Sequence, residues 1–143
     1  MLAADALSSN DVPPFDRAMM DGYAVRLADA GQTVSVLDEI AAGDGRPRPT
    51  PNAGHIHAIM TGAPVPASAE AVVPLELVQR SGDRVVLPER IRPSWNIARR
   101  GSECTVGKAW ARAGEHVTPL TIAAALTVGC TQLGVHPRPR VAI

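Results

Sequence analysis

Frequent chain reversals are the strongest constraint on how this sequence folds. Its 143 residues include 12 glycines and 13 prolines, and both residue types interrupt regular helices and strands. The apolar share of 45% allows a packed core, but aromatic residues make up only 3%, so Val, Ala, Leu and Ile must fill it. We therefore predict a loop-rich, mainly β protein with one modest core or two small lobes.

Charge and cysteine content argue against several classes of function. Fourteen basic and 14 acidic residues cancel, so the chain has no overall field to attract nucleic acid or an anionic membrane. Only two cysteines occur, Cys104 and Cys130, and no apolar run is long enough for a signal sequence or a membrane span. We expect a cytoplasmic protein with reduced thiols, while the sequence leaves a disulfide between the two cysteines open.

Alternating polar and apolar residues predict short strands in the first half of the chain. Residues 20–25 form a turn that leads into a strand, and residues 33–37 and 55–60 alternate with period two. Between the latter two, residues 42–51 are rich in Gly, Pro and Arg, which predicts a flexible loop. Further on, the β-branched runs 71–78 and 84–87 predict the two strands of a hairpin.

One helix is predicted near the C-terminus. Thr118 is a good N-cap, Pro119 suits the first turn, and Gly129 follows the last position of the run 120–128. The run is apolar on nearly all faces, so we expect the helix to be buried between other elements. In that case Leu126→Ala should destabilise the protein by roughly 2–5 kcal/mol.

Three polar positions flank tight glycine turns, where backbone N–H groups become available to bind an oxyanion or a polar side chain can hold a metal. They are Asp21 before Gly22, Thr61 before Gly62, and the segment 99–103. Arginine forks in that segment suit phosphate-like anions, and its acidic residue, like the aspartate, could hold a cation or orient a hydroxyl group. Routine turns and solvated arginines are the alternative interpretation of the same residues.

Other chemistries have weaker support. His55 and His57 share one face of a predicted strand, as zinc ligands could, but no third ligand lies nearby in sequence. No Walker loop, G-x-G-x-x-G, H-E-x-x-H or G-x-S-x-G motif is present. Several longer segments are more specific: residues 12–17 (VPPFDR), 20–25 (MDGYAV), 59–66 (IMTGAPVP), 71–76 (AVVPLE), 96–101 (NIARRG), 114–119 (GEHVTP) and 139–143 (PRVAI).

Together these segments closely resemble the MoeA family of molybdopterin molybdenumtransferases, to which the carboxy-terminal domain of gephyrin is related. The resemblance implies a complex fold of coiled and bifurcated β-sheets. It implies an inserted β-rich lobe at residues 8–107, and a discontinuous lobe formed by residues 1–7 and 108–143. It also implies that the chain begins after the family's first long helix and stops where the pterin-binding α/β domain begins.

The resemblance further implies the reaction and the site. Molybdate is inserted into the dithiolene of adenylylated molybdopterin with release of AMP, in a step assisted by Mg2+, and the active site lies between the subunits of a homodimer. The family's usual Arg-Gly-Glu-Asp reads Arg-Gly-Ser-Glu here. The metal ligands stay unassigned. The site residues carried over are Asp21, Thr61 and Glu103 as catalytic, and Arg99, Arg100 and Ser102 as cofactor-binding.

The implied partners are the molybdopterin nucleotide, molybdate and a MogA-like adenylyltransferase that acts earlier in the pathway. Because the pterin-binding domain lies outside this sequence, the isolated chain is expected to be inactive. The main alternative is a scaffold or dimerisation module of the same fold, since gephyrin shows by resemblance that this architecture can serve receptor clustering. An unrelated structural β domain is the third interpretation.

Overall fold

The computed structural model describes residues 1–46 and 51–142. The chain divides into two compact units. The central unit is Phe15–Arg99, and the terminal unit combines Met1–Pro14 with Arg100–Ile143. Both units consist mainly of short strands and turns, as the density of glycine and proline predicts.

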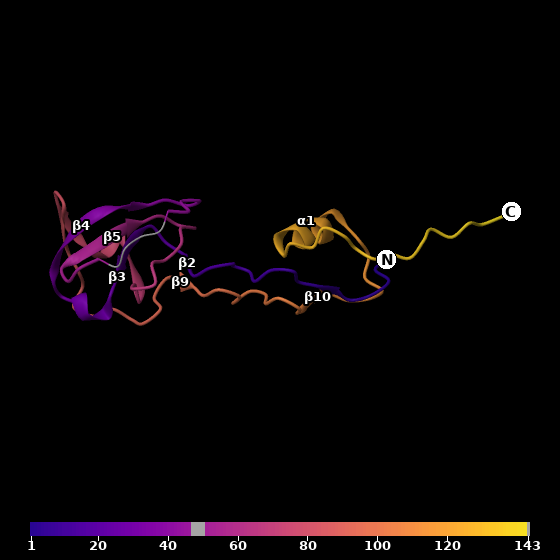
Figure 1. The fold of residues 1–143 in the computed structure, drawn as a ribbon, viewed down its shortest axis with the longest axis horizontal. Coiled ribbons are helices and arrows are strands. Elements are labelled where there is room, and N and C mark those ends of the chain that lie inside the picture. Colours follow the sequence, from indigo (N-terminus) through magenta and orange to yellow (C-terminus); the bar gives the residue numbers. More distant parts are fainter. Residues whose placement is uncertain (47–50, 143) are drawn as a thin grey trace. The chain divides into compact units, whose positions relative to one another are not determined.

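A curled six-stranded sheet forms the body of the central unit (Figure 1). Neighbouring strands are antiparallel, except that β4 and β5 run parallel. A second, two-stranded antiparallel sheet joins β2 (Arg17–Ala18) to β9 (Ile97–Ala98). In spatial order the six strands are β6 (Ala71–Pro74), β3 (Gly22–Val25), β5 (His55–Ile59), β4 (Thr33–Ile40), β8 (Arg84–Val86) and β7 (Gln79–Ser81).

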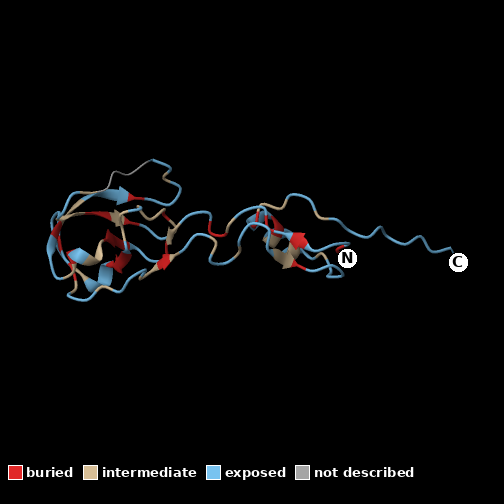
Figure 2. Cartoon of the chain, turned by 60° about the horizontal axis from the view of Figure 1, so that its bottom comes forward, coloured by how far each residue is buried: buried red, intermediate tan, exposed pale blue. Residues whose placement is uncertain are grey.

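Small aliphatic side chains fill the core on both faces of this sheet. Successive residues of a strand point to opposite faces, so Tyr23 and Val25 enter one cluster while Ala24 enters the other. Buried residues accordingly line the strands of the central unit (Figure 2). The first cluster comprises Tyr23, Val25, Val34, Ile56, Ala71, Val73, Val85 and Leu87, and the second Ala18, Ala24, Ile40, Ile59, Ala63, Val72 and Ile97.

The predicted strands at residues 20–25, 33–37 and 55–60 are confirmed as β3, β4 and β5. Strand β4 is three residues longer than expected, since it continues to Ile40, which is buried. Of the predicted loop at residues 42–51, positions 47–50 lie outside the described residues, and the rest is irregular as expected.

The predicted pairing of residues 71–78 with 84–87 is wrong. Strand β6 ends at Pro74, and a 3₁₀ turn, Leu75–Leu77, redirects the chain to the opposite edge of the sheet. The partner of β8 is the short strand β7, and Gly82, with a φ of 62°, forms the turn between them. Strand β6 instead pairs with β3, so only the first half of the β-branched run 71–78 belongs to the sheet.

The terminal unit contains a strand pair and a short helix. Strands β1 (Ala6–Leu7) and β10 (Ala109–Ala111) are antiparallel, and α1 spans Pro119–Thr127. The predicted ends of the helix are confirmed, because the Thr118 hydroxyl accepts a hydrogen bond from the Thr121 N–H at 3.2 Å and Gly129 has a φ of 73°. The unit also includes residues 8–14 and 100–107, which the expected boundaries assign to the inserted lobe.

The prediction that this helix is buried is wrong. Leu120, Ile122 and Leu126 are 79%, 51% and 66% exposed, and within the helix only Ala125 is buried. The described part of the terminal unit covers the helix along the side of Ala125 and Val128, and leaves its larger apolar side chains uncovered. No helix in the described ranges is long and apolar enough to cross a membrane.

The exposure of Leu126 reverses the expected effect of its replacement. In this chain, Leu126→Ala should change the free energy of unfolding by no more than about 0.5 kcal/mol, as for other exposed positions. Leu2→Ala provides the matched control in the same unit, because Leu2 is only 1% exposed and truncating a buried leucine costs about 2–5 kcal/mol. Urea denaturation of both variants measures the difference. A Leu126→Ala cost as large as that of Leu2→Ala would contradict this assignment.

Candidate active site

Asp21 and Thr61, 40 positions apart in sequence, are joined by two hydrogen bonds. The Thr61 backbone N–H and its hydroxyl both donate to Oδ1 of Asp21, at 2.7 Å and 2.6 Å. Both residues are exposed. Oδ2 of Asp21 has no hydrogen-bond partner within residues 1–46 and 51–142. Thr61 therefore fixes Oδ1 of Asp21, and Oδ2 is left exposed to solvent.

The central sheet brings these two residues together. Asp21 immediately precedes β3, and one residue, Met60, separates the end of β5 from Thr61. Gly22 lies opposite Ile59 where these two antiparallel strands pair. Gly22 also lies opposite Pro74 of β6. A Cβ atom at this glycine would lie 2.8 Å from the carbonyl carbon of Val73 and closer still to its oxygen. Only glycine therefore allows β3 to approach β6 this closely.

The hydrogen bonds from Thr61 also set the charge of Asp21. The side-chain bond from Thr61, and then its backbone bond, hold the pKa of the Asp21 carboxyl below its ordinary value because they favour the ionised form. Asp21 is thus a carboxylate at neutral pH. Thr61 was expected to donate to a bound oxyanion, but in this structure both of its donors serve Asp21.

Arg99 belongs to the central unit and holds two backbone segments together. Its Nη1 pairs with Oδ2 of Asp16, and its Nη2 donates to the Ser94 hydroxyl at 2.7 Å. Arg99 is half exposed, with 50% of its side chain accessible. These contacts indicate a clamp between the β2 and β9 regions, in addition to any contact with a ligand.

Arg100, Ser102 and Glu103 lie in one turn of the terminal unit. Arg100 Nε donates to Asp11 Oδ2 at 2.7 Å, and the Glu103 backbone N–H donates to the Val12 carbonyl at 2.9 Å. Asp11 has a pKa below its ordinary value, because the Val106 N–H and then Arg100 bind its carboxylate. The side chains of Ser102 and Glu103 are exposed.

Two open pockets in the central unit are each lined in part by the segment before Asp21. One, of about 310 Å³, is lined by Thr61 and Gly62 and by Arg17, Ala18 and Met19 of the β2 segment. The other, of about 370 Å³, is mainly apolar. Its lining residues are Phe15, Gly43, Asp44, Gly45, Arg46 and Pro64.

Comparison with known proteins assigns the chain to a family. The family described as MoeA N-terminal region (domain I and II) matches residues 1–129. The chain belongs to the MoeA family. A solved structure of a MoeA protein, described as molybdopterin biosynthesis moeA protein from Pyrococcus horikoshii OT3, superposes with a TM-score of 0.84 at 31% identity, over 92% of this chain and 36% of that one. The mainly β, MoeA-like fold inferred from sequence is thus confirmed.

Curated MoeA relatives are considerably longer than this chain. Molybdopterin molybdenumtransferase 2 of Mycobacterium tuberculosis (strain H37Rv) is 35% identical over 150 residues, which cover 100% of this chain and 37% of the relative. Molybdopterin molybdenumtransferase of Staphylococcus aureus (strain MSSA476) is 31% identical over 150 residues, covering 100% and 36%. The chain therefore spans little more than a third of the relatives that it matches.

The two histidines considered as zinc ligands have other surroundings in this MoeA chain. His57 is 3% exposed and its Nδ1 pairs with Asp38 of β4, whereas His55 Nδ1 lies 3.2 Å from the Ala53 carbonyl oxygen. The described residues contain no group of three or more His, Cys, Asp or Glu side chains that could hold a metal ion.

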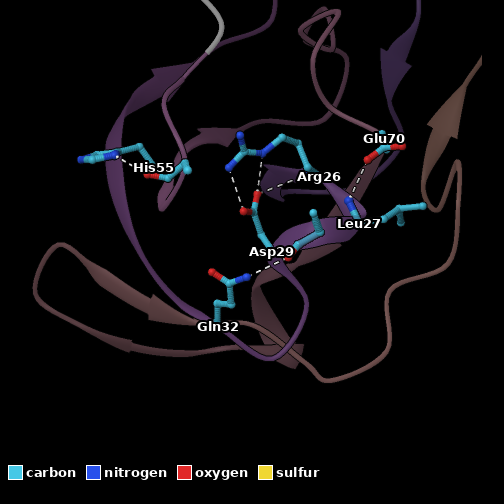
Figure 3. Close-up of polar contacts among 8 residues, drawn as sticks. Arg26, Leu27, Asp29, Gln32, His55 and Glu70 are labelled. Carbon is cyan, nitrogen blue, oxygen red and sulfur yellow. Dashed lines mark hydrogen bonds and ion pairs between the residues drawn. The ribbon is translucent and has the colours of Figure 1, made fainter.

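A second polar cluster, at the 3₁₀ turn Leu27–Asp29, has a structural role (Figure 3). Arg26 forms a two-pronged ion pair with the buried Asp29, at 2.9 Å and 2.8 Å, and Glu70 Oε2 accepts from the Leu27 N–H at 2.9 Å. The adjoining cavity, bordered by His55, has a volume of about 10 Å³, which is room for one water at most. These bonds fix the turn after β3 and leave no space for a ligand.

Sequence reasoning missed three charged residues that contact the candidate residues or line a pocket with one of them. Asp11 and Asp16 bind the two arginines of the Arg-Arg-Gly loop, and Arg17 lines the pocket beside Thr61. A usable signal was present, since these residues flank a Val-Pro-Pro-Phe segment that offers no other charge. Charged residues next to a rigid segment are candidates to anchor that segment or to bind a ligand.

Proposed function

We propose that this chain forms the N-terminal part of a molybdopterin molybdenumtransferase, in which the Asp21–Thr61 pair is one wall of the active site. Such an enzyme inserts molybdate into adenylylated molybdopterin and releases AMP. The observation that carries the proposal is the geometry of the pair: an ionised carboxylate, held on one oxygen by Thr61 and open on the other, beside a pocket of about 310 Å³.

The chemistry of the pair suits a positioning task in this reaction. The open Oδ2 of Asp21 accepts a hydrogen bond from a substrate N–H or O–H, and Thr61 keeps the carboxylate in place without reorganisation during the reaction. Molybdate and the phosphate of the substrate are anions, so a carboxylate alone would repel them. Arg17, on the wall of the same pocket, supplies the opposite charge.

Arg99 lies in the same unit as the pair, where it holds the Asp16 segment and keeps an exposed side chain that can bind an anionic group of the substrate. In the terminal unit, Arg100 and Ser102 are proposed as cofactor-binding residues and Glu103 as a catalytic residue. The enzyme works in the cytoplasm as a homodimer and receives adenylylated molybdopterin from a MogA-like adenylyltransferase.

A chimera tests this function. The matching N-terminal part of Mycobacterium tuberculosis molybdopterin molybdenumtransferase 2 is replaced by this chain, and AMP release is measured with adenylylated molybdopterin and molybdate. We expect turnover by the chimera and none by the isolated chain, because the bound substrate must be oriented by the rest of the enzyme. A folded but inactive chimera would refute the proposal, and single-turnover AMP release by the isolated chain would refute the need for the missing part.

The exposed apolar side of α1 favours a second candidate, a non-catalytic dimerisation module. Leu120, Ile122 and Leu126 form an apolar surface that the described residues leave open, and surfaces of this kind mark protein interfaces. Sedimentation velocity of the isolated chain, with Leu126→Glu as the disrupting variant, tests whether this surface self-associates, and the activity of the chimera separates the two candidates. Dimerisation of the chain, combined with an inactive chimera, would favour the scaffold.

A further inference from the structure

The turn Ser94-Trp95-Asn96 has an uncommon backbone. Ser94 and Asn96 have φ angles of 57° and 54°, and in the described chain they are the only residues other than glycine with positive φ. Asparagine tolerates this left-handed conformation better than most side chains. Backbone of this kind persists only where the surrounding contacts hold it in place, and it is concentrated at functional sites.

On one side, the turn is bonded along the outer edge of the central sheet. Strand β6 is an edge strand, and both main-chain polar groups of Val72 are satisfied by the turn. The Val72 N–H donates to the Trp95 carbonyl at 2.8 Å, and the Asn96 side-chain amide donates to the Val72 carbonyl at 3.0 Å. The Ser94 N–H adds a bond to the Glu70 carbonyl at 2.8 Å. The turn therefore takes the place of a neighbouring strand.

On its other side, the turn holds the segment that carries Asp21. The Asn96 carbonyl accepts a hydrogen bond from the Met19 N–H at 2.9 Å, two residues before Asp21. Immediately after Asn96, Ile97 of β9 pairs with Ala18 of β2. Only Met20 separates the anchored Met19 from Asp21.

The same short strand is tied to the loop of Thr61. Ala18 accepts a hydrogen bond from the Gly62 N–H at 2.9 Å and donates one to the Ala63 carbonyl at 3.0 Å. Strand β2 thus lies between the Asn96 turn and the Thr61 loop. A shift of Asn96 would move the segment before Asp21 and the strand that fixes Thr61.

We infer that Asn96 is a positioning residue for the Asp21–Thr61 pair. Its amide fastens the turn to Val72 of the rigid sheet, and its carbonyl transmits that position to Met19 and hence to Asp21. Asn96 touches neither Asp21 nor Thr61 through any bond that the structure shows, so its action is indirect. That the position of Asp21 matters for catalysis rests on the proposed function. That Asn96 sets this position does not.

The test is an NMR titration of the Asp21 carboxyl carbon in the 143-residue chain, which requires no enzymatic activity. The reference variant Thr61→Val removes the side-chain hydrogen bond to Asp21 and should raise its pKa toward the ordinary value. Asn96→Ala loses the amide and strains the backbone, and should raise the pKa of Asp21 in the same direction. Asn96→Gly loses only the amide and gains flexibility, and should produce a smaller rise.

Asn52→Ala is the matched control, because Asn52 is an exposed asparagine of the same unit and should leave the pKa of Asp21 at its parent value. Glycine adopts the left-handed conformation freely, so Asn96→Gly keeps the test decisive if Asn96→Ala does not fold. A folded Asn96 variant with the parent pKa at Asp21 would overturn the inference. That outcome would leave the proposed function intact, and an inactive chimera would leave the titration result intact.

Discussion

Replacing Asp21 with alanine in the chimeric enzyme should lower kcat on the order of 10²-fold or more, the usual cost of removing a preorganised polar group from an active site. Thr61 already holds this carboxylate ionised and in one orientation, so its loss removes an interaction that no other described side chain is placed to supply. The denaturation midpoint should scarcely move, because Asp21 is exposed and lies at a loop tip. The measurements are steady-state AMP release and urea denaturation of the same preparations.

Asp83→Ala provides the control for this experiment. Asp83 is also an exposed aspartate next to a glycine turn of the central unit, but it lies in the β7–β8 hairpin. Its replacement should leave kcat unchanged. Normal turnover in Asp21→Ala, or a loss of activity only in step with unfolding, would reduce Asp21 to an ordinary turn residue.

Gly22→Ala should disrupt the central unit, with a cost above about 4 kcal/mol, which is exceptional for a single substitution. The added Cβ would lie 2.8 Å from the backbone carbonyl carbon of Val73 and 3.1 Å from Cα of Pro74. Both atoms belong to a neighbouring strand, so no side-chain rotation can relieve the overlap. Strands β3 and β6 would have to separate, and the core clusters on both faces of the sheet would open with them.

Gly45→Ala is the matched control, because a Cβ at Gly45 would meet no atom of the described residues within 4 Å. This variant should unfold at the parent midpoint. Circular dichroism and one-dimensional NMR of both variants show whether the central unit has folded. A Gly22→Ala protein with dispersed methyl signals and an unchanged midpoint would contradict the proposed close approach of β3 and β6.

Features set by neighbouring residues could be predicted from the sequence. The helix ends follow from Thr118 and Gly129, whose capping roles depend on residues within one turn. Strands β4 and β5 follow from their side-chain alternation, and β3 follows from the turn at residues 20–25 that leads into it. The location of Asp21 and Thr61 next to strand ends could be predicted from the same local patterns. Their role as site residues, which the resemblance to the MoeA family implies, stays a prediction.

Features that depend on long-range pairing could not be predicted. The bond between Asp21 and Thr61 exists because β3 is placed next to β5, although β4 lies between them in sequence. The run 71–78 carries no local signal that it breaks after Pro74, so that β6 lies at one sheet edge and the strand that follows the run, β7, lies at the other. The exposure of Leu126 depends on how much of the helix other elements cover, and the apolar sequence of the helix does not indicate this.

The composition of the terminal unit has a consequence for synthesis on the ribosome. Its strand β1 emerges first, but its partner β10 emerges only about a hundred residues later, after the whole central unit. The central unit can therefore fold before residues 1–14 have their partners in the terminal unit, and Leu2 and Ala6 stay uncovered during this time. Domains fold as they emerge, and unpaired edges and apolar surface favour aggregation in the meantime. We expect the nascent chain to be more exposed to chaperones and proteases during this interval than after residues 109–111 have paired with β1 and residues 115–135 have covered Leu2.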